Sequence, residues 1–241
     1  VVRRVGGVRG LAAGQIGETD CEELGDGLLA QPVNAITSGA YALIGIWLVV
    51  RAWRGPRQTR WLQVVYAITL MVIGIGSIAF HGPQPGWAKL VHDAPIATAL
   101  VFILLYDIQL LAGWKPWVTL ATYGVLVLAV FAGFELDSTA GIVVTGLVVA
   151  GAIVAEVLVI RRGLRVRPPW MATWRWYAIM AGVLAIAGLA NVLGRTDAPL
   201  CEADSLLQLH GLWHIMTAIV FGLWAVIAFP ATPRATQPDE G

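Results

Sequence analysis

The chain has 241 residues, of which 58% are hydrophobic and only 13% are charged, and its mean hydropathy is +0.74. A soluble globular domain has about 25% charged residues and could not bury this much apolar surface, so that class is excluded. With a net charge of +1, nothing in the composition indicates a nucleic-acid partner.

Apolar runs of about 20 residues, long enough to cross a hydrocarbon core of about 30 Å as a helix, recur along the chain. They predict an all-α polytopic membrane protein, a bundle of seven transmembrane helices in a lipid bilayer. The third and fourth runs are separated only by the stretch from Trp114 to Trp117, so one broken helix is the alternative there. The predicted spans are residues 33–52, 62–81, 92–113, 116–134, 139–160, 174–194 and 206–229.

The spans divide the chain into an extracytoplasmic N-terminal segment (1–32), a transmembrane domain (33–229) and a disordered cytoplasmic tail (230–241). Lysine and arginine accumulate in cytoplasmic loops, which sets the orientation. Eleven basic residues flank one side: Arg51, Arg54, Arg57, Arg60, Lys115, Arg161, Arg162, Arg165, Arg167, Arg175 and Arg234. Five flank the other: Arg3, Arg4, Arg9, Lys89 and Arg195. The N-terminus is therefore expected outside the cytoplasm, or in a lumen, and the C-terminus in the cytosol.

In this topology the only two cysteines, Cys21 and Cys201, both face the extracytoplasmic side. Disulfides persist in such compartments, and a bridge would tie the N-terminal segment to the loop before the last span. The alternative is two unrelated buried thiols, since free cysteine is often buried. The shared side of the membrane favours the bridge.

Two of the four histidines, His210 and His214, lie four residues apart at the start of the seventh span. On a helix this spacing directs both imidazoles to one side, an arrangement that can grip a zinc ion. His81 ends the second span on the same side of the membrane and supplies a third ligand. Three protein ligands with an open fourth position are typical of a catalytic zinc, which activates water.

Two further polar side chains lie beside this predicted site. Ser77 shares a helix face with His81, and Asp93 opens the third span at the same depth. An acid in an apolar span costs about 2.5–3.5 kcal/mol, so Asp93 is interpreted as functional, as a proton acceptor or water-orienting group. His92, beside it, is an alternative third ligand. The non-functional alternative is that each histidine only hydrogen-bonds a neighbouring helix.

The ordered motifs resemble the alkaline ceramidase family, within a superfamily of seven-helix membrane hydrolases that includes the adiponectin-type receptors. The resemblance covers nearly the whole chain. Its pieces are Cys21-Glu22-Glu23, Asn34 and Ser38, Gly76-Ser77-Ile78-Ala79-Phe80-His81, Asp93-Ala94-Pro95, Asp197 with Cys201, and His210-Gly211-Leu212-Trp213-His214.

The resemblance implies a zinc ion held by His81, His210 and His214, with Ser77 and Asp93 as catalytic partners. It implies a zinc-dependent amidohydrolase whose activated water cleaves ceramide, an N-acyl sphingoid base, to sphingosine and a fatty acid. It also implies a disulfide between Cys21 and Cys201. A related N-acyl lipid, or a lipid ester, is an alternative substrate.

Family members also carry a calcium site around the Cys-Glu-Glu motif. Here Thr19, Leu24 and Gln31 stand where acidic or amide ligands are expected. Because calcium takes six to eight oxygen ligands, only a remnant of that site is expected, at Asp20 and Glu22.

Three other functions compete with hydrolysis. A receptor-like or lipid-binding protein with structural zinc would bind without turnover. A membrane haem protein needs histidines on facing helices, which an i, i+4 pair does not provide. A transporter needs acids at the midplane, whereas Asp93, Asp107 and Glu156 lie at span ends. The excess of arginine over lysine suggests a bacterial inner-membrane protein.

Overall fold

A computed structural model describes residues 16–165 and 174–229 of the chain. The predicted disordered tail and residues 1–15 of the predicted N-terminal segment lie outside the described residues. The described part is all-helical apart from one isolated β-bridge between Asp20 and Arg195.

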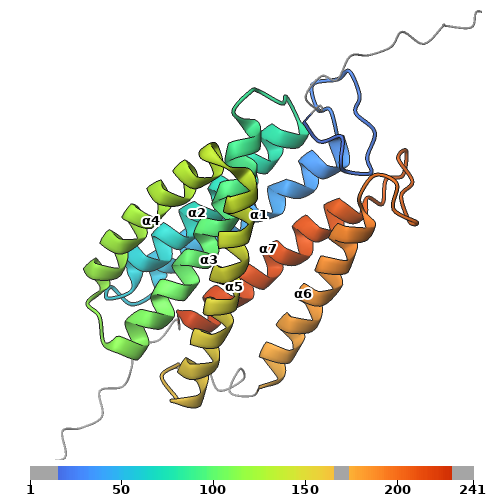
Figure 1. Ribbon diagram of the computed structural model, residues 1–241. Coiled ribbons are helices and arrows are strands. Elements are labelled where there is room, and N and C mark those ends of the chain that lie inside the picture. The colour runs from blue at the N-terminus through green and yellow to red at the C-terminus, as the bar shows by residue number, and fades with distance from the viewer. Residues whose placement is uncertain (1–15, 166–173, 230–241) are drawn as a thin grey trace, which may run out of the picture.

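The described residues form seven helices, which confirms the predicted number and class (Figure 1). Each is long and apolar enough to cross a bilayer, so the chain is a multi-pass membrane protein. The helices are α1 (Pro32–Arg54), α2 (Arg60–His81), α3 (Ala88–Ala112), α4 (Pro116–Leu136), α5 (Ser138–Arg161), α6 (Arg175–Leu193) and α7 (Leu209–Ala228).

The third and fourth spans are separate helices, not one broken helix. Gly113 ends α3 in the left-handed conformation, with φ of 68°, which glycine adopts without a Cβ clash. Lys115 is then extended, and Pro116 begins α4 at a position where its missing N–H costs nothing. A glycine stop and a proline start thus reverse the chain within three residues.

The helices pack in an open series rather than a closed ring. Helix α1 packs on α2 and α7, α2 packs on α3, and α3 packs on both α4 and α5. Helix α6 packs on α7, whereas α5 packs on α3 and α4. The side of the bundle between α5 and α6 therefore lacks a closely packed helix pair.

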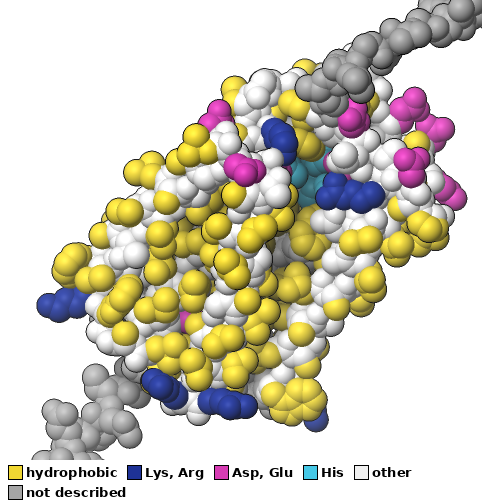
Figure 2. All heavy atoms as spheres, in the orientation of Figure 1, with side chains coloured by type: hydrophobic (Ala, Val, Ile, Leu, Met, Phe, Trp, Pro, Cys, Tyr) yellow, Lys and Arg dark blue, Asp and Glu magenta, His cyan; other side chains and the backbone are white. Residues whose placement is uncertain are grey.

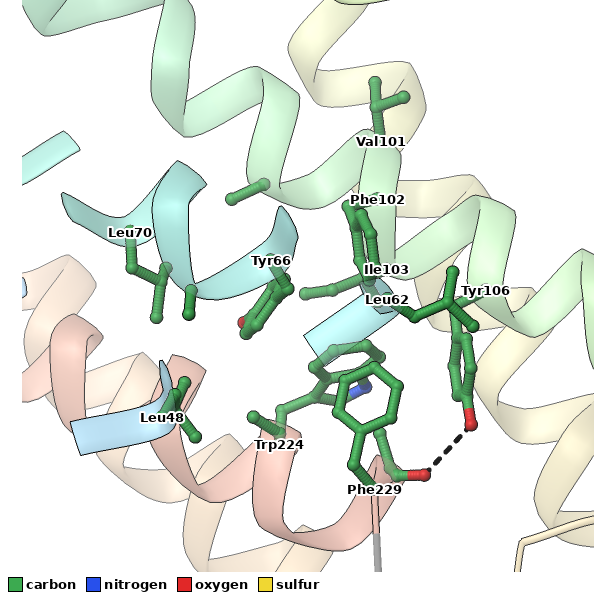
Figure 3. Packing of buried hydrophobic residues seen from close by; sticks show 14 of the residues in the cluster. Leu48, Leu62, Tyr66, Leu70, Val101, Phe102, Ile103, Tyr106, Trp224 and Phe229 are labelled. Atoms are coloured by element: carbon green, nitrogen blue, oxygen red, sulfur yellow. Dashed lines mark hydrogen bonds between the residues drawn. The ribbon is translucent and has the colours of Figure 1, made fainter. Parts of the chain in front are cut away.

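The largest hydrophobic cluster of the described residues is centred on α2, α3 and α7, and Leu48 of α1 joins it (Figure 3). Tyr66 is its centre, with its ring 4.9 Å from Trp224 and 5.2 Å from Phe102, centroid to centroid. Its hydroxyl donates to the Phe221 carbonyl, and the Tyr106 hydroxyl donates to that of Ala228. This cluster holds the three helices that carry the histidines.

The outer sides of the bundle are apolar. Leu43, Leu147 and Leu189 are each more than 60% exposed. Figure 2 shows hydrophobic side chains over the flank of the molecule, with charged side chains mostly toward its two ends. This pattern matches a bilayer around the helices and water at both ends.

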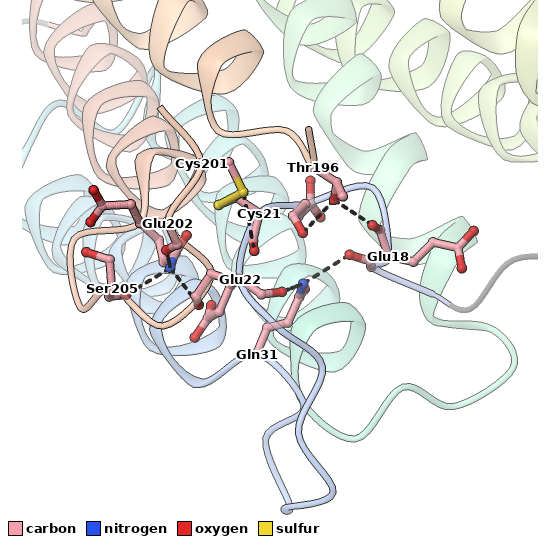
Figure 4. Close-up of a disulfide and its surroundings, with 12 residues drawn as sticks. Glu18, Cys21, Glu22, Gln31, Thr196, Cys201, Glu202 and Ser205 are labelled. Atoms are coloured by element: carbon pink, nitrogen blue, oxygen red, sulfur yellow. Dashed lines mark hydrogen bonds between the residues drawn. A yellow bond between two sulfur atoms is a disulfide. The ribbon is translucent and has the colours of Figure 1, made fainter. Parts of the chain in front are cut away.

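A covalent cap covers part of the end of the bundle where α2 ends and α7 begins, called here the histidine end. Cys21 and Cys201 form a disulfide, as predicted, joining the N-terminal segment to the loop before α7 (Figure 4). The Cys21 amide donates to the Gly194 carbonyl, and the Thr196 amide to the Thr19 carbonyl. These bonds fix residues 16–31 across the mouth of the bundle.

Candidate metal centre

Four histidines from three helices converge at the histidine end. His81 is the last residue of α2, His92 lies in the first turns of α3, and His210 and His214 lie in the first turns of α7. One ring nitrogen from each lies within 4.8 Å of the others. The predicted group of three is therefore brought together, and the alternative ligand His92 joins it.

A close approach of two helices brings α2 and α3 into position for this site. A Cβ atom on Gly76 would lie 1.8 Å from the carbonyl oxygen of Val91, so only glycine allows the contact. Gly76 precedes Ser77, and Val91 precedes His92. The His92 ring also stacks on Phe80, with centroids 4.2 Å apart. Helix packing and stacking together hold His92 against the end of α2.

Each histidine has an oxygen within 3.5 Å of its Nδ1 atom, and all but His210 make a hydrogen bond there. The nearest oxygens are Gln31 Oε1 at 2.7 Å from His81, Asp93 Oδ1 at 2.7 Å from His92, Asp20 Oδ1 at 3.5 Å from His210 and Ser38 Oγ at 3.2 Å from His214. Metal-binding histidines typically have such partners, which orient the ring so that the other nitrogen faces the metal.

The inner nitrogens suit a metal ion. His81, His210 and His214 are each at most 3% exposed, and Nε2 of both His81 and His210 has no hydrogen-bond partner among the described residues. A buried polar atom without a partner is costly, and a cation would satisfy both. Imidazole nitrogens suit zinc, and bonds of about 2.0–2.1 Å would draw such nitrogens to about 3.3 Å from one another. The residues therefore fit a zinc ion.

Ser77 lies inside the group, as predicted from its helix face. Its Oγ atom is 3.4 Å from Nε2 of His214 and 2.8 Å from Oγ of Ser38. The Ser38 hydroxyl also donates to the Asn34 carbonyl at 2.6 Å. A chain of two hydroxyls thus leads from α1 to the histidines, and Ser77 ends that chain.

Asp93, predicted to lie beside the metal site, contacts one histidine of the group. Its carboxylate contacts Nδ1 of His92 and Nζ of Lys89, each at 2.7 Å. It also lines a pocket of about 560 Å³ between the start of α3 and the α4–α5 turn, with Trp87, Lys89, Phe134 and Glu135. Asp93 therefore reaches the histidine group through His92.

Asp20 was expected only as part of a calcium remnant, but it faces the histidines. It is 4% exposed and accepts a hydrogen bond from Arg195 at 3.1 Å. Burial raises the pKa of the Asp20 carboxyl above its ordinary value, and Arg195 acts in the opposite direction. Sequence spacing could not predict that Asp20 lies beside His210, because the disulfide-bonded N-terminal segment brings the two residues together.

Glu22 and Gln31 fill the rest of the expected calcium region. The Glu22 carboxylate accepts from the backbone N–H groups of Val33 and Asn34. The Gln31 amide nitrogen donates to the carbonyls of Gly17 and Glu22. Asp20 and Glu22 therefore face different partners. The Gln31 side chain directs a hydrogen-bond donor at the Gly17 and Glu22 carbonyl oxygens.

The histidines are open to the outside on one face. Figure 2 shows their rings at the floor of an opening, with a basic side chain on either side. The surface below the opening is hollowed and flanked by hydrophobic side chains, in the region between α5 and α6. The histidines are therefore accessible from outside the bundle on this face.

A family model described as Ceramidase matches residues 26–239 of this chain. The match covers all seven helices and all four histidines. No curated protein matches the sequence. The chain belongs to the Ceramidase family, and membership implies an amidohydrolase that acts on a lipid amide in a membrane.

Proposed function

We propose that this protein is a zinc-dependent membrane amidohydrolase that cleaves ceramide, or a related N-acyl lipid, to a sphingoid base and a fatty acid. The observation that carries the proposal is the convergence of His81, His210 and His214 in a buried group of a Ceramidase-family bundle. Nε2 of both His81 and His210 has no hydrogen-bond partner among the described residues, which supports a metal there.

His81, His210 and His214 would hold the zinc ion, which would supply a Lewis acid able to polarise the amide carbonyl and to lower the pKa of a water molecule to about 7. The water oxygen forms a bond to the carbonyl carbon, and the carbon–nitrogen bond breaks. One water proton stays on the acid and the other goes to the leaving amine. Burial and the oxygens beside the Nδ1 atoms hold the histidine rings in place while the amide bond is cleaved.

Ser77 stabilises the negative charge that develops on the carbonyl oxygen. Its Oγ atom lies 3.4 Å from Nε2 of His214 and 2.8 Å from Oγ of Ser38. Because the Ser38 hydroxyl donates to Asn34, the Ser77 hydroxyl donates to Ser38 before the substrate binds, and it would rotate toward the carbonyl oxygen of the bound substrate. A donor aimed at a developing oxyanion in a dry site is worth about 2.7–4 kcal/mol of the barrier.

Asp93 acts as the proton acceptor through His92. The His92 ring lies between Asp93 and the other histidines, with its Nδ1 atom on the carboxylate. A carboxylate behind an imidazole orients the ring and stabilises its charged form. His92 would carry the proton from water to the amine nitrogen.

The orientation of the chain in the membrane is inferred from the distribution of its basic residues and from its disulfide. The N-terminal segment and the histidine end lie outside the cytoplasm, since eleven of sixteen basic residues flank the opposite side. A disulfide at the histidine end favours the same side. The composition fits a bacterial inner membrane. Fusing a reporter active only outside the cytoplasm after residue 229 tests this, and activity there would reverse the orientation.

A second candidate, a receptor-like or lipid-binding protein with structural zinc, is favoured by one observation. His92 belongs to the same group as the other three histidines. Four imidazoles would fill a tetrahedral site and leave no open position, as structural zinc sites do. X-ray absorption of the zinc protein separates the two: three nitrogens and one oxygen support hydrolysis, and four nitrogens support the structural role.

The deciding experiment measures bound metal and lipid turnover together. The protein is purified in detergent and incubated with ceramides of several acyl lengths and with matched lipid esters, and released fatty acid is followed by mass spectrometry. His214→Ala removes a ligand. Gln63→Met removes a buried amide from the far end of α2 and serves as the control.

One zinc per chain and fatty-acid release that His214→Ala loses but Gln63→Met keeps would establish the hydrolase. Release from esters alone would change the substrate class. Bound zinc without turnover of any lipid would refute hydrolysis and leave the second candidate.

A further inference from the structure

We infer that Gln31 is a positioning residue of the metal centre: its amide fixes His81 in the tautomer whose Nε2 atom faces the metal. The inference rests on the proposed function, because it takes His81 as a ligand. It adds a residue outside the helical motifs, at the last position before α1.

Gln31 is fully buried, and both ends of its amide are engaged. The nitrogen Nε2 donates to the Gly17 carbonyl at 3.0 Å and to the Glu22 carbonyl at 2.7 Å. The oxygen Oε1 lies 2.7 Å from Nδ1 of His81. The Gln31 backbone N–H also donates to the His81 carbonyl at 2.7 Å, so the two residues are joined twice.

The two carbonyls determine which way the amide points. A carbonyl oxygen only accepts hydrogen bonds, so the end of the amide that faces Gly17 and Glu22 must be the NH₂ group. The flipped amide would set an oxygen against two oxygens and lose both bonds in a buried place. Oε1 is therefore left toward His81, and it too can only accept.

The tautomer of His81 follows from this direction. An acceptor at Nδ1 requires a proton on Nδ1, so in the neutral ring Nε2 carries the free lone pair. His81 Nε2 is a buried atom without a hydrogen-bond partner in the described part of the chain. It belongs to the ring that meets the other three histidines. Gln31 thus presents the metal with a nitrogen already in its binding form.

Gly17 makes room for this arrangement. Its φ is +82°, a conformation natural to glycine, and a Cβ atom there would lie 2.7 Å from Gln31 Oε1. Gly17 and Glu22 lie on either side of Cys21 in the disulfide-bonded segment (Figure 4). One side chain therefore holds both the N-terminal segment and a zinc ligand.

Two variants separate the contact of Gln31 with the N-terminal segment from its contact with His81. Gln31→Met keeps the volume and removes all polar contacts of the side chain, so zinc affinity should fall about 10–100-fold, as for other outer partners of histidine ligands. Gln31→Glu keeps an acceptor for His81 but loses both donors. It should retain zinc affinity close to that of the wild type while the melting temperature falls. Gln63→Met is the control for loss of a buried amide on α2.

Zinc affinity is measured by competition with a chelator, and unfolding is followed in parallel. Unchanged zinc affinity in Gln31→Met, with a melting temperature lowered like that of Gln63→Met, would reduce Gln31 to a structural residue. If wild-type protein still releases fatty acid in that case, the proposed function survives and only this inference fails.

A measurement on the wild type covers the case in which Gln31→Met does not fold. Labelling with ¹⁵N-histidine gives only four ring systems, assigned by single substitutions. In the zinc-free protein, a proton on Nδ1 of His81 supports the inference. A proton on Nε2 instead would overturn it.

Discussion

The Glu22 carboxylate caps the N-terminus of α1 from ten residues before that helix begins at Pro32. Its two oxygens accept from Val33 N at 2.7 Å and Asn34 N at 2.8 Å, while the adjacent residue Gln31 makes no side-chain cap. Free N–H groups at a helix start attract negative charge. The cap thus joins the N-terminal segment to the helix that carries Ser38.

Replacing this carboxylate should destabilise the protein. Glu22→Gln leaves one acceptor oxygen and turns an NH₂ group toward a backbone N–H, so we expect a loss of about 1–2 kcal/mol in the free energy of unfolding. SDS titration in mixed micelles measures it. Glu23→Gln, on the exposed neighbour, is the control and should change little. Equal loss in both variants would mean that the cap contributes nothing.

The disulfide should stabilise the metal centre as well as the fold. Cys21 lies beside Asp20 and Glu22, and Asp20 faces His210. Replacing both cysteines by alanine should cost about 2–4 kcal/mol of unfolding free energy. Because the segment then moves more freely, zinc should also leave faster to a chelator. The measurement is the rate of zinc release with and without reductant. Reductant should speed release from the wild type and leave the double variant unchanged.

The sequence predicted the seven spans well because length and hydropathy are local properties. The i, i+4 histidines of α7 and Ser77 before His81 were also readable, since helix periodicity alone directs them. The place of His92 was not readable: the sequence offered it only as an alternative to His81, whereas the structure puts both histidines in one group. Neighbouring residues point about 100° apart on a helix, and the rotation of α3 is set by contacts such as Gly76 with Val91.

The partners of buried charges were hidden for a similar reason. The sequence places Asp107 and Glu156 at the ends of spans but does not show which cation they contact. In the structure Arg165, beyond the end of α5, pairs with both, at 2.5 Å from Asp107. Such pairing depends on how the chain turns after the helix, which composition does not reveal.

Arg165 is the cation of a buried cluster and should be hard to replace. Trp224 donates to Glu156, and the guanidinium lies over the ring of Tyr106. Burial alone would lower the pKa of Arg165, but Asp107 and Glu156 raise it, so it stays charged.

Arg165→Met leaves two acids unpaired and should cost about 3–5 kcal/mol of unfolding free energy. Adding Asp107→Asn and Glu156→Gln should recover most of that loss, because no charge then lacks a partner. Arg161→Met, at an exposed site, should stay within about 0.5 kcal/mol of the wild type. Unfolding in SDS compares the four proteins, and a triple variant as unstable as Arg165→Met would contradict this account.

The contact between Gly76 and Val91 should be the least tolerant position near the metal centre. An alanine Cβ at residue 76 would lie 1.8 Å from a backbone oxygen, which cannot rotate away, so α2 and α3 must separate. Gly76→Ala should cost about 1–3 kcal/mol of unfolding free energy through overpacking. The same shift moves Ser77 and His81 away from His92, and a displacement of about 1 Å can lower turnover about 100-fold.

Gly124→Ala is the matched control, because no atom lies within 4 Å of its added Cβ. It lies inside α4, where alanine should stabilise by about 0.4–1 kcal/mol. Fatty-acid release and SDS unfolding are measured on both variants. If Gly76→Ala matched Gly124→Ala in both, α2 and α3 would not approach this closely, and another contact would have to orient His92.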